Sequence, residues 1–171
     1  VIRGELLTDD GIVIATTEVA SDGTEKRVYP YDDLFAHAVG YASHGKSGIE
    51  LLANYQLLTS HAYFLERFVN EVQEEKNIGD NVITTLDFEL QKAAYDALGN
   101  YDGAVIAMEP STGKILAMVS KPDYDSNQIA ANWKSISESS ESVLLNRVAQ
   151  GLYPPGSTFK ILTLLEYLRE G

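Results

Sequence analysis

The chain has 171 residues, of which 44% are hydrophobic, enough for one buried core or for one core with a small additional unit. Its formal net charge of −12 disfavours a nucleic-acid ligand, because a phosphate backbone would be repelled. The absence of cysteine excludes disulfides and thiolate metal sites. No apolar run approaches the ~20 residues of a membrane span and no signal peptide is present, so we expect any membrane anchor to lie outside this sequence.

The N-terminal residues predict a β-hairpin. Two short apolar runs, residues 1–7 and 11–15, are separated by a turn that contains Asp10-Gly11. Asp-Gly between β-prone runs is a strong hairpin signal. This pattern is fully explained by a structural role.

Residues 50–68 have mostly helical spacing of apolar and aromatic side chains, which we interpret as a core-facing helix. A charged run at 71–76 is typical of a solvated face, and residues 77–81 are typical of a turn.

His44 and His61 have no group of carboxylates or cysteines at ligand spacing, so we expect no metal site. His37 stands among apolar residues, where a structural role is more common than catalysis.

In the middle of the chain, residues 82–86 predict an extended segment, and Asp87 can cap a helix that ends before Gly99. Residues 103–108 and 114–120 predict two strands around a turn. The first strand is apolar at nearly every position, which predicts burial on both faces. After a loop at 121–127, the polar, serine-rich residues 128–143 predict a mobile segment with Trp133 as its anchor.

Chemistry is concentrated near the C-terminal end. Pro154-Pro155-Gly156 stops the preceding structure, Ser157 can cap a new helix, and an apolar run follows. Lys160 would lie on the same helix face as Ser157. A serine hydroxyl becomes nucleophilic when a base takes its proton, and a lysine can be that base when its surroundings favour the neutral amine. The first-turn N–H groups would favour an oxyanion.

The spacing alone is weak evidence, because Ser43 and Lys46, and also Ser111 and Lys114, are separated in the same way. Only Ser157 opens an apolar helix, whereas the other two serines lie in loop or turn sequences. A helix cap followed by a solvated lysine is the competing interpretation.

The longer sequence around Ser157 resembles a known family. Residues 153–160, Tyr-Pro-Pro-Gly-Ser-Thr-Phe-Lys, closely resemble the active-site Ser-x-x-Lys segment of the penicillin-binding proteins, the serine D,D-transpeptidases of peptidoglycan synthesis. Residues 144–147, Leu-Leu-Asn-Arg, and the strand-turn-strand segment 103–118 are also similar to that family. Glu109 stands where the family more often has Asp.

Earlier segments are similar, in the right order, to the non-catalytic pedestal of the class B, monofunctional members. They are Arg3-Gly4 with Asp9-Asp10-Gly11, then Ala36-His37-Ala38-Val39-Gly40-Tyr41, then Gly48-Ile49-Glu50, and the junction at 84–91. Asp10 departs from the Arg that is more common there.

The resemblance implies an α+β fold. Residues 1–80 would form the pedestal, a dimerisation-type domain, and residues 81–171 would begin a β-lactamase/transpeptidase-like domain with its first hairpin and its Ser-x-x-Lys helix. The family's Ser-x-Asn and Lys-Thr-Gly motifs do not occur in the chain, and the helix after Ser157 is apolar on almost all sides. We therefore expect the polypeptide to be an incomplete, N-terminal portion.

By the same resemblance, Ser157 would attack a terminal D-Ala-D-Ala of a peptidoglycan stem peptide, Lys160 would be its base, and the Ser157 N–H would form half of the oxyanion hole. β-Lactams would acylate Ser157. The implied location is the extracytoplasmic face of the bacterial cell membrane, no metal or organic cofactor is implied, and the partners would be the rest of the transpeptidase domain and cell-wall synthesis or division proteins. Without two of three motifs, we expect this chain alone to be inactive.

Two alternatives stay open. A β-lactam-recognising hydrolase or sensor also has Ser-x-x-Lys, although the pedestal segments argue against a stand-alone β-lactamase. The chain could instead be a non-catalytic docking module for cell-wall synthesis partners, with Ser157 unused.

Overall fold

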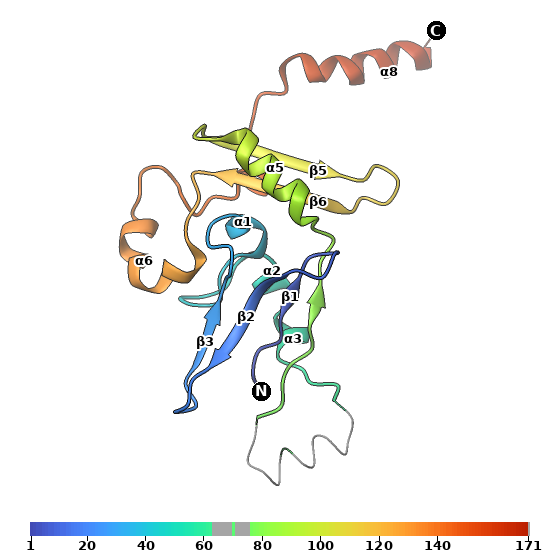
Figure 1. Ribbon diagram of the computed structural model, residues 1–171. Helices are drawn as coiled ribbons and strands as arrows, with labels where there is room; N and C mark the ends of the chain where they lie inside the picture. Colours follow the sequence, from blue (N-terminus) through green and yellow to red (C-terminus); the bar gives the residue numbers. More distant parts are fainter. Residues whose placement is uncertain (63–69, 71–75, 171) are drawn as a thin grey trace.

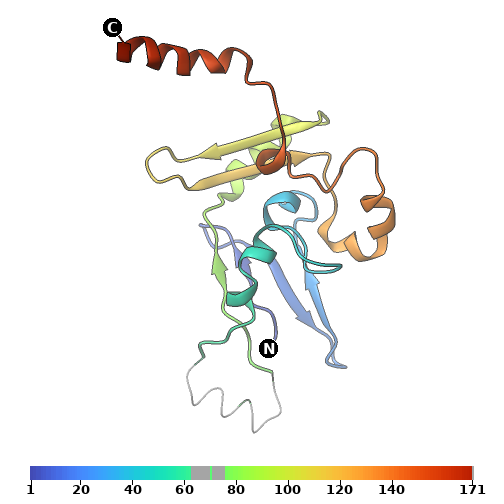
Figure 2. The ribbon, with the colours of Figure 1, turned by 180° about the vertical axis from the view of Figure 1, so that it is seen from behind.

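A computed structural model describes residues 1–62, 70 and 76–170 (Figures 1 and 2). Its elements, in chain order, are β1 (Leu6–Leu7), β2 (Val13–Val19), β3 (Glu25–Val28), α1 (Ala36–Val39), α2 (Gly48–Leu52), α3 (Asn54–Leu57), β4 (Val82–Ile83), α5 (Phe88–Leu98), β5 (Gly103–Met108), β6 (Ile115–Lys121), the 3-10 helix η1 (Ser126–Gln128), α6 (Ile129–Ser137), α7 (Arg147–Gln150), the 3-10 helix η2 (Gly156–Phe159) and α8 (Lys160–Glu170). This mixture confirms the predicted α+β class.

Two packed parts and one isolated helix make up the architecture. The four-stranded sheet with helices α1–α3, here named the sheet module (residues 1–62 and 76–86), lies below the β5–β6 hairpin in Figure 1. Helix α5 lies across that hairpin, and with α6 and α7 they form the hairpin module (residues 87–151). Helix α8 stands away from both modules at the end of an extended segment in both views (Figures 1 and 2).

The sheet has the order β3-β2-β1-β4, with β1 parallel to β4 and antiparallel to β2. The Thr8–Ile12 turn joins β1 to β2 and is closed by Thr8 N–H donating to the Ile12 carbonyl at 2.9 Å, which confirms the predicted hairpin. Strand β3 could not be predicted from its sequence pattern, because Glu25, Lys26 and Arg27 are all charged. It forms because it pairs with β2.

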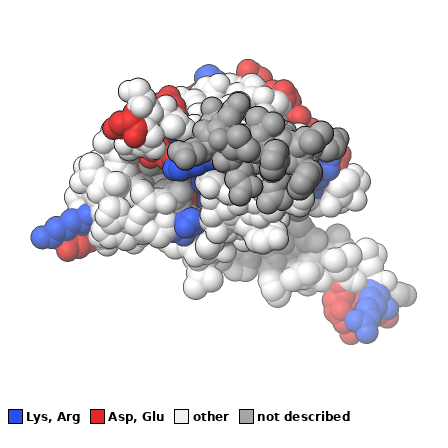
Figure 3. Space-filling view, turned by 90° about the horizontal axis from the view of Figure 1, so that it is seen from below, with Lys and Arg blue, Asp and Glu red and all other residues white. Residues whose placement is uncertain are grey.

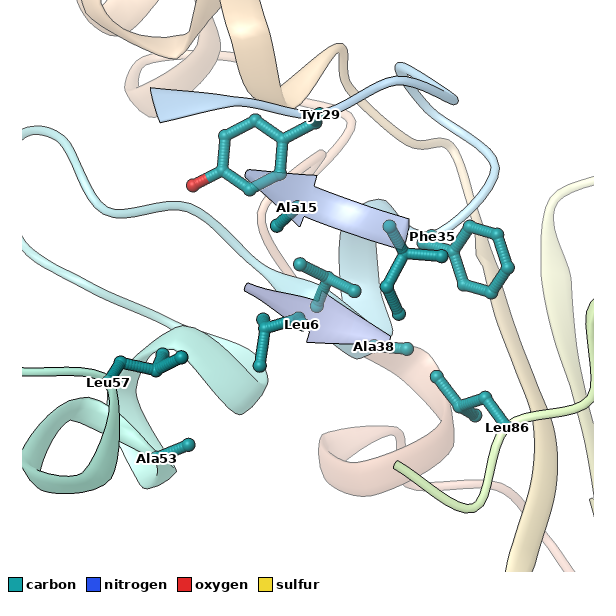
Figure 4. Packing of buried hydrophobic residues seen from close by; sticks show 10 residues of the cluster. Leu6, Ala15, Tyr29, Phe35, Ala38, Ala53, Leu57 and Leu86 are labelled. Carbon is teal, nitrogen blue, oxygen red and sulfur yellow. The ribbon is translucent and has the colours of Figure 1, made fainter. Parts of the chain in front are cut away.

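Apolar side chains between the sheet and its helices form the main core. Figure 4 shows Leu6 in the middle of this cluster, with Ala53 and Leu57 at one end and Leu86 at the other. Leu6 and Leu57 are fully buried. Each such side chain contributes about 1.5–3 kcal/mol through removal of apolar surface from water. The core therefore joins residues from both sides of the 63–75 segment.

A buried ion cluster lies beside this core. The Glu50 carboxylate is 0% exposed. It accepts from Arg3 Nε at 2.6 Å on one oxygen and from Arg27 Nε at 2.7 Å on the other. The two guanidinium groups also donate to the Glu50 and Gly4 carbonyls, each at 2.6 Å. Charges taken out of water are tolerated only when paired and hydrogen-bonded in this way.

Gly4, which follows Arg3, permits a close backbone contact. A Cβ at this position would lie 2.1 Å from the Asp80 carbonyl oxygen. The Gly4 N–H donates to the Leu57 carbonyl at 2.9 Å, so three distant segments meet here. The Arg-Gly pair thus combines a buried cation with the one residue type that fits.

Helix α5 begins and ends as the sequence predicts. The Asp87 carboxylate accepts from Leu90 N–H at 2.7 Å, and Gly99 follows the last turn with a φ of 55°. On the inner side, the fully buried Gln91 amide donates to the Leu34 and Met118 carbonyls and accepts from Met118 N–H. Gln91 therefore joins α5, β6 and the sheet module.

The Asp87 cap gives a first testable prediction. Asp87→Ala is expected to lower the free energy of unfolding by about 1 kcal/mol, because it removes the hydrogen-bond acceptor for the first turn of α5. Chemical denaturation followed by circular dichroism measures this. Asp102→Ala, which removes an exposed carboxylate just before β5, is the matched control. Equal losses in both variants would contradict the capping assignment.

The predicted helix over residues 50–68 is wrong in its first part. The chain forms two short helices, α2 and α3, and residues 63–68 lie outside the described residues. Leu57 is buried, but Leu52 is 82% exposed and Tyr55 is 75% exposed. The predicted apolar face is not continuous, because the break between α2 and α3 at Ala53 changes which side chains face the core.

Two other expectations also need correction. Strand β5 is not covered on both faces: its burial alternates, and Ile106 and Met108 are exposed. Residues 128–143 include helix α6, which is anchored by the fully buried Ile129. Trp133 is an anchor as predicted, because its ring packs edge-on against Tyr41 with centroids 6.0 Å apart. Spaced apolar residues among the serines suffice to order this helix.

Hydrogen bonds from the β6–α6 segment fix the two modules together. Asn127 pairs with the Tyr29 backbone in both directions at 2.9 Å. The Ser126 hydroxyl donates to the Gly40 carbonyl at 2.9 Å, and the buried Tyr124 hydroxyl donates to the Ala36 carbonyl at 3.0 Å. The modules therefore form one packed body, from which the C-terminal segment leaves.

Charges on the lower face of this body are mixed. In Figure 3 the visible Lys and Arg residues lie singly or beside Asp and Glu, without a continuous basic patch among the described residues. This mixture on the visible face is consistent with the net charge of −12.

Candidate active site

Ser157 and Lys160 lie at the start of the isolated C-terminal helix. Ser157 is within η2, and Lys160 is the first residue of α8. Gly156 precedes them with a φ of 53°, a left-handed conformation that favours glycine and lets the chain turn sharply into the helix. The Lys160 N–H donates to the Ser157 carbonyl, so the two residues stand one turn apart as predicted.

The expected helix cap by Ser157 is wrong. Ser157 stands inside η2, and the residue before that 3-10 helix is Pro155. It is the neighbouring Thr158 that bonds locally, through its hydroxyl to the Pro155 carbonyl at 2.5 Å. The Ser157 hydroxyl therefore does not cap the helix, although the competing interpretation requires such a cap.

Helix α8 exposes apolar side chains around its circumference. Ile161, Leu162, Leu164 and Leu165 are each more than half exposed, and so is Phe159 at the end of η2. Both Ser157 and Lys160 are also exposed. A helix that is apolar on all sides is normally enclosed by other parts of a protein. In this structure α8 is not enclosed, so Ser157 and Lys160 are in contact with solvent.

The other two Ser-x-x-Lys pairs have different settings. Ser43 and Lys46 lie in the loop between α1 and α2, and Ser111 and Lys114 lie in the turn between β5 and β6. Neither pair stands at the start of a helix. Of the three pairs, only Ser157 and Lys160 stand at the start of a helix.

The segment before Ser157 is fixed to the body at α7. The Asn146 side chain accepts from the N–H groups of Val148 and Ala149 at 3.0 and 3.2 Å, and it donates to the His37 carbonyl at 3.0 Å. Asn146 is not among the functional candidates predicted from the sequence. Its role as a helix cap could have been predicted, because Asn is a preferred residue directly before the first turn of a helix.

His37 has the structural role that its sequence context predicts. Its ring is buried, with Nε2 3.1 Å from the Pro122 carbonyl oxygen and its centroid 5.1 Å from that of Tyr124. Burial lowers the pKa of His37, so the ring is neutral at neutral pH, and its Nε2–H donates a hydrogen bond to that carbonyl. Burial likewise raises the pKa of Tyr124 to about 12, which keeps its hydroxyl protonated as a donor.

Potential metal ligands are dispersed over the described part of the chain. Within residues 1–62, 70 and 76–170, no three His, Asp or Glu side chains gather as they would around an ion. His61 and Asp80 form a pair that is exposed at His61.

Family profiles match both halves of the chain. Residues 3–82 match the penicillin binding protein A dimerisation domain, and residues 103–171, which include Ser157 and Lys160, match the penicillin binding protein transpeptidase domain. The chain belongs to the penicillin-binding proteins. The family suggested by the Ser157 segment is therefore confirmed along nearly the whole chain.

Curated relatives support this membership. The chain is 38% identical to the peptidoglycan D,D-transpeptidase PbpA of Mycolicibacterium smegmatis over 99% of its own length, which is 38% of that protein. It is 28% identical to the peptidoglycan D,D-transpeptidase MrdA of Escherichia coli over 87% of its length, 29% of that protein. The chain thus spans less than two fifths of these penicillin-binding proteins.

Solved penicillin-binding proteins share the fold. Penicillin-binding protein A from M. tuberculosis, solved as an imipenem acyl-enzyme complex, matches with a TM-score of 0.88 and 33% identity over 99% of this chain and 42% of that one. The D,D-transpeptidase domain of a peptidoglycan glycosyltransferase from Eggerthella lenta matches with a TM-score of 0.83 and 39% identity over 98% of this chain and 37% of that one.

Among the described helices of the present chain, none is long and apolar enough to cross a membrane.

Proposed function

We propose that this chain is part of a serine D,D-transpeptidase that cross-links peptidoglycan stem peptides and is acylated by β-lactams at Ser157. The observation that supports this most directly is the match, over nearly the whole chain, to a penicillin-binding protein solved as an acyl-enzyme. The exposed Ser157 at a helix start, one turn before Lys160, provides the nucleophile and base that such an acyl-enzyme requires.

The proposed reaction has two steps. The Ser157 Oγ attacks the carbonyl carbon of the penultimate D-Ala, Lys160 takes the hydroxyl proton, and the oxyanion is stabilised in part by the Ser157 N–H. Collapse breaks the peptide bond, and the proton passes to the departing D-Ala amine. An amine from a neighbouring strand then attacks the ester, which restores Ser157 and forms the cross-link.

The remaining assignments follow from this proposal. Residues 1–80 would be the pedestal and residues 81–171 the beginning of the transpeptidase domain, with the remainder of that domain as the first partner of α8. The enzyme would act on the extracytoplasmic face of the bacterial cell membrane, where stem peptides are exposed, and cell-wall synthesis or division proteins would be further partners. No metal or organic cofactor takes part in the proposed steps.

The test is intact mass spectrometry after incubation with penicillin G, followed by peptide mapping. In protein that contains the complete catalytic domain, we expect one stable acyl adduct on Ser157, no adduct in Ser157→Ala, and an unchanged adduct in the control Ser111→Ala. The 171-residue chain alone is expected to form none, because its site lacks preorganisation.

Other outcomes distinguish the alternatives. An adduct on Ser157 that is released within seconds would favour a β-lactam hydrolase. No adduct in the complete protein would favour a non-catalytic docking module, which also predicts that Ser157→Ala leaves function in cells intact.

A further inference from the structure

Asn146 occupies the junction between the sheet module and the chain segment that leads to Ser157. Its amide nitrogen donates to the His37 carbonyl of α1 at 3.0 Å and lies 3.4 Å from Met118 Sδ of β6. Its amide oxygen accepts the two N–H bonds that begin α7. One side chain thus connects α1, β6 and α7.

The residues on either side of Asn146 are held by a single buried hydroxyl. Ser120 Oγ donates to the Leu145 carbonyl at 3.2 Å and accepts from Arg147 N–H at 3.0 Å. Ser120 lies on β6 and is 2% exposed. The bonds to Ser120 therefore fix the backbone around Asn146 to strand β6. The bond from Asn146 to the His37 carbonyl then links this segment to α1.

Beyond α7 the chain has few bonds to the body. The Gly151 N–H, just after α7, bonds back to the Arg147 carbonyl, and the next hydrogen bonds along the chain are local ones from Thr158 to the Pro155 carbonyl. One side of α7 borders an open pocket of about 480 Å³, which is lined by residues that include His37, Asn146 and Ala149. The hydrogen bonds at its N-terminus therefore have a large share in fixing where the chain departs toward Ser157.

We propose that Asn146 is a positioning residue for the nucleophile: by joining α1 to α7, it makes the placement of Ser157 depend on the sheet module. This inference rests on the proposed acyl transfer at Ser157. Small displacements of a nucleophile have large effects on rate, whereas the same displacements change stability little. The residue never touches the substrate and acts only through the chain that follows it.

The experiment compares two variants that each disturb one bond to an α1 carbonyl. Asn146→Asp keeps the oxygen that caps α7 but loses the donor to His37, whereas Tyr124→Phe loses the donor to Ala36 and leaves α7 untouched. Both are made in protein with the complete catalytic domain. Stopped-flow acylation by a fluorescent penicillin separates the initial binding constant from the acylation rate, and active-site titration corrects for folded fraction.

For Asn146→Asp we expect the acylation rate to fall about tenfold with unchanged initial binding, and for Tyr124→Phe less than a twofold change. The proposal is overturned if Asn146→Asp acylates at the unmodified rate, or if Tyr124→Phe slows acylation equally, since that result indicates general damage to the joint. Failure of the proposed function is distinguishable, because unmodified protein would then form no adduct on Ser157.

Discussion

Replacing Glu50 with alanine is expected to reduce the free energy of unfolding by about 3–5 kcal/mol, which is a large fraction of the stability of an ordinary domain. The reason is what the substitution leaves behind. Arg3 and Arg27 are about one-tenth exposed, and both lose their carboxylate partner in a site that is largely shielded from water. An uncompensated buried charge costs far more than the lost attraction of an exposed pair.

Glu50→Gln separates charge from shape. The amide keeps one oxygen for a guanidinium but turns an NH2 toward the other, so we expect a loss nearly as large as that of alanine. Chemical denaturation with a fluorescence signal is the measurement. The matched control is Asp96→Ala, which breaks the exposed pair with Lys92 on α5 and is expected to have little effect. A Glu50→Ala protein as stable as the control would contradict the structural role of the cluster.

This cluster also illustrates what the sequence does not specify. Glu50 meets partners that lie 47 and 23 residues away, and no local pattern states which of the 13 Lys and Arg residues they are. The Asp87 cap and the Thr8–Ile12 turn could be predicted, because their physical causes lie within a few residues. Burial could not be predicted in the same way. The sequences of β5 and α8 are apolar enough for buried elements, but whether they are buried depends on residues far away along the chain.

The candidate site likewise has one part that could be predicted from the sequence and one part that could not. The Ser157 segment is distinctive by itself, so its residues could be named from the sequence. The importance of Asn146 depends on the His37 carbonyl, 109 residues away, and appears only when the two modules are packed together.

Lys160→Ala is expected to slow acylation of Ser157 by a β-lactam by about 10²- to 10⁴-fold, the usual contribution of a positioned general base. The measurement is the acylation rate of a fluorescent penicillin in protein with the complete catalytic domain. Lys114→Ala is the matched control, because Lys114 has the same spacing to Ser111 but lies in the β5–β6 turn, and it should leave the rate unchanged.

Lys160→Arg determines which property of the lysine matters. Arginine keeps the positive charge and most of the length, but its guanidinium cannot lose a proton in a protein and so cannot accept one from Ser157. If Lys160 acts as the base, Lys160→Arg should be as slow as Lys160→Ala. If the arginine variant instead acylates near the unmodified rate, the lysine acts through its charge, and the proton of Ser157 must leave by another group.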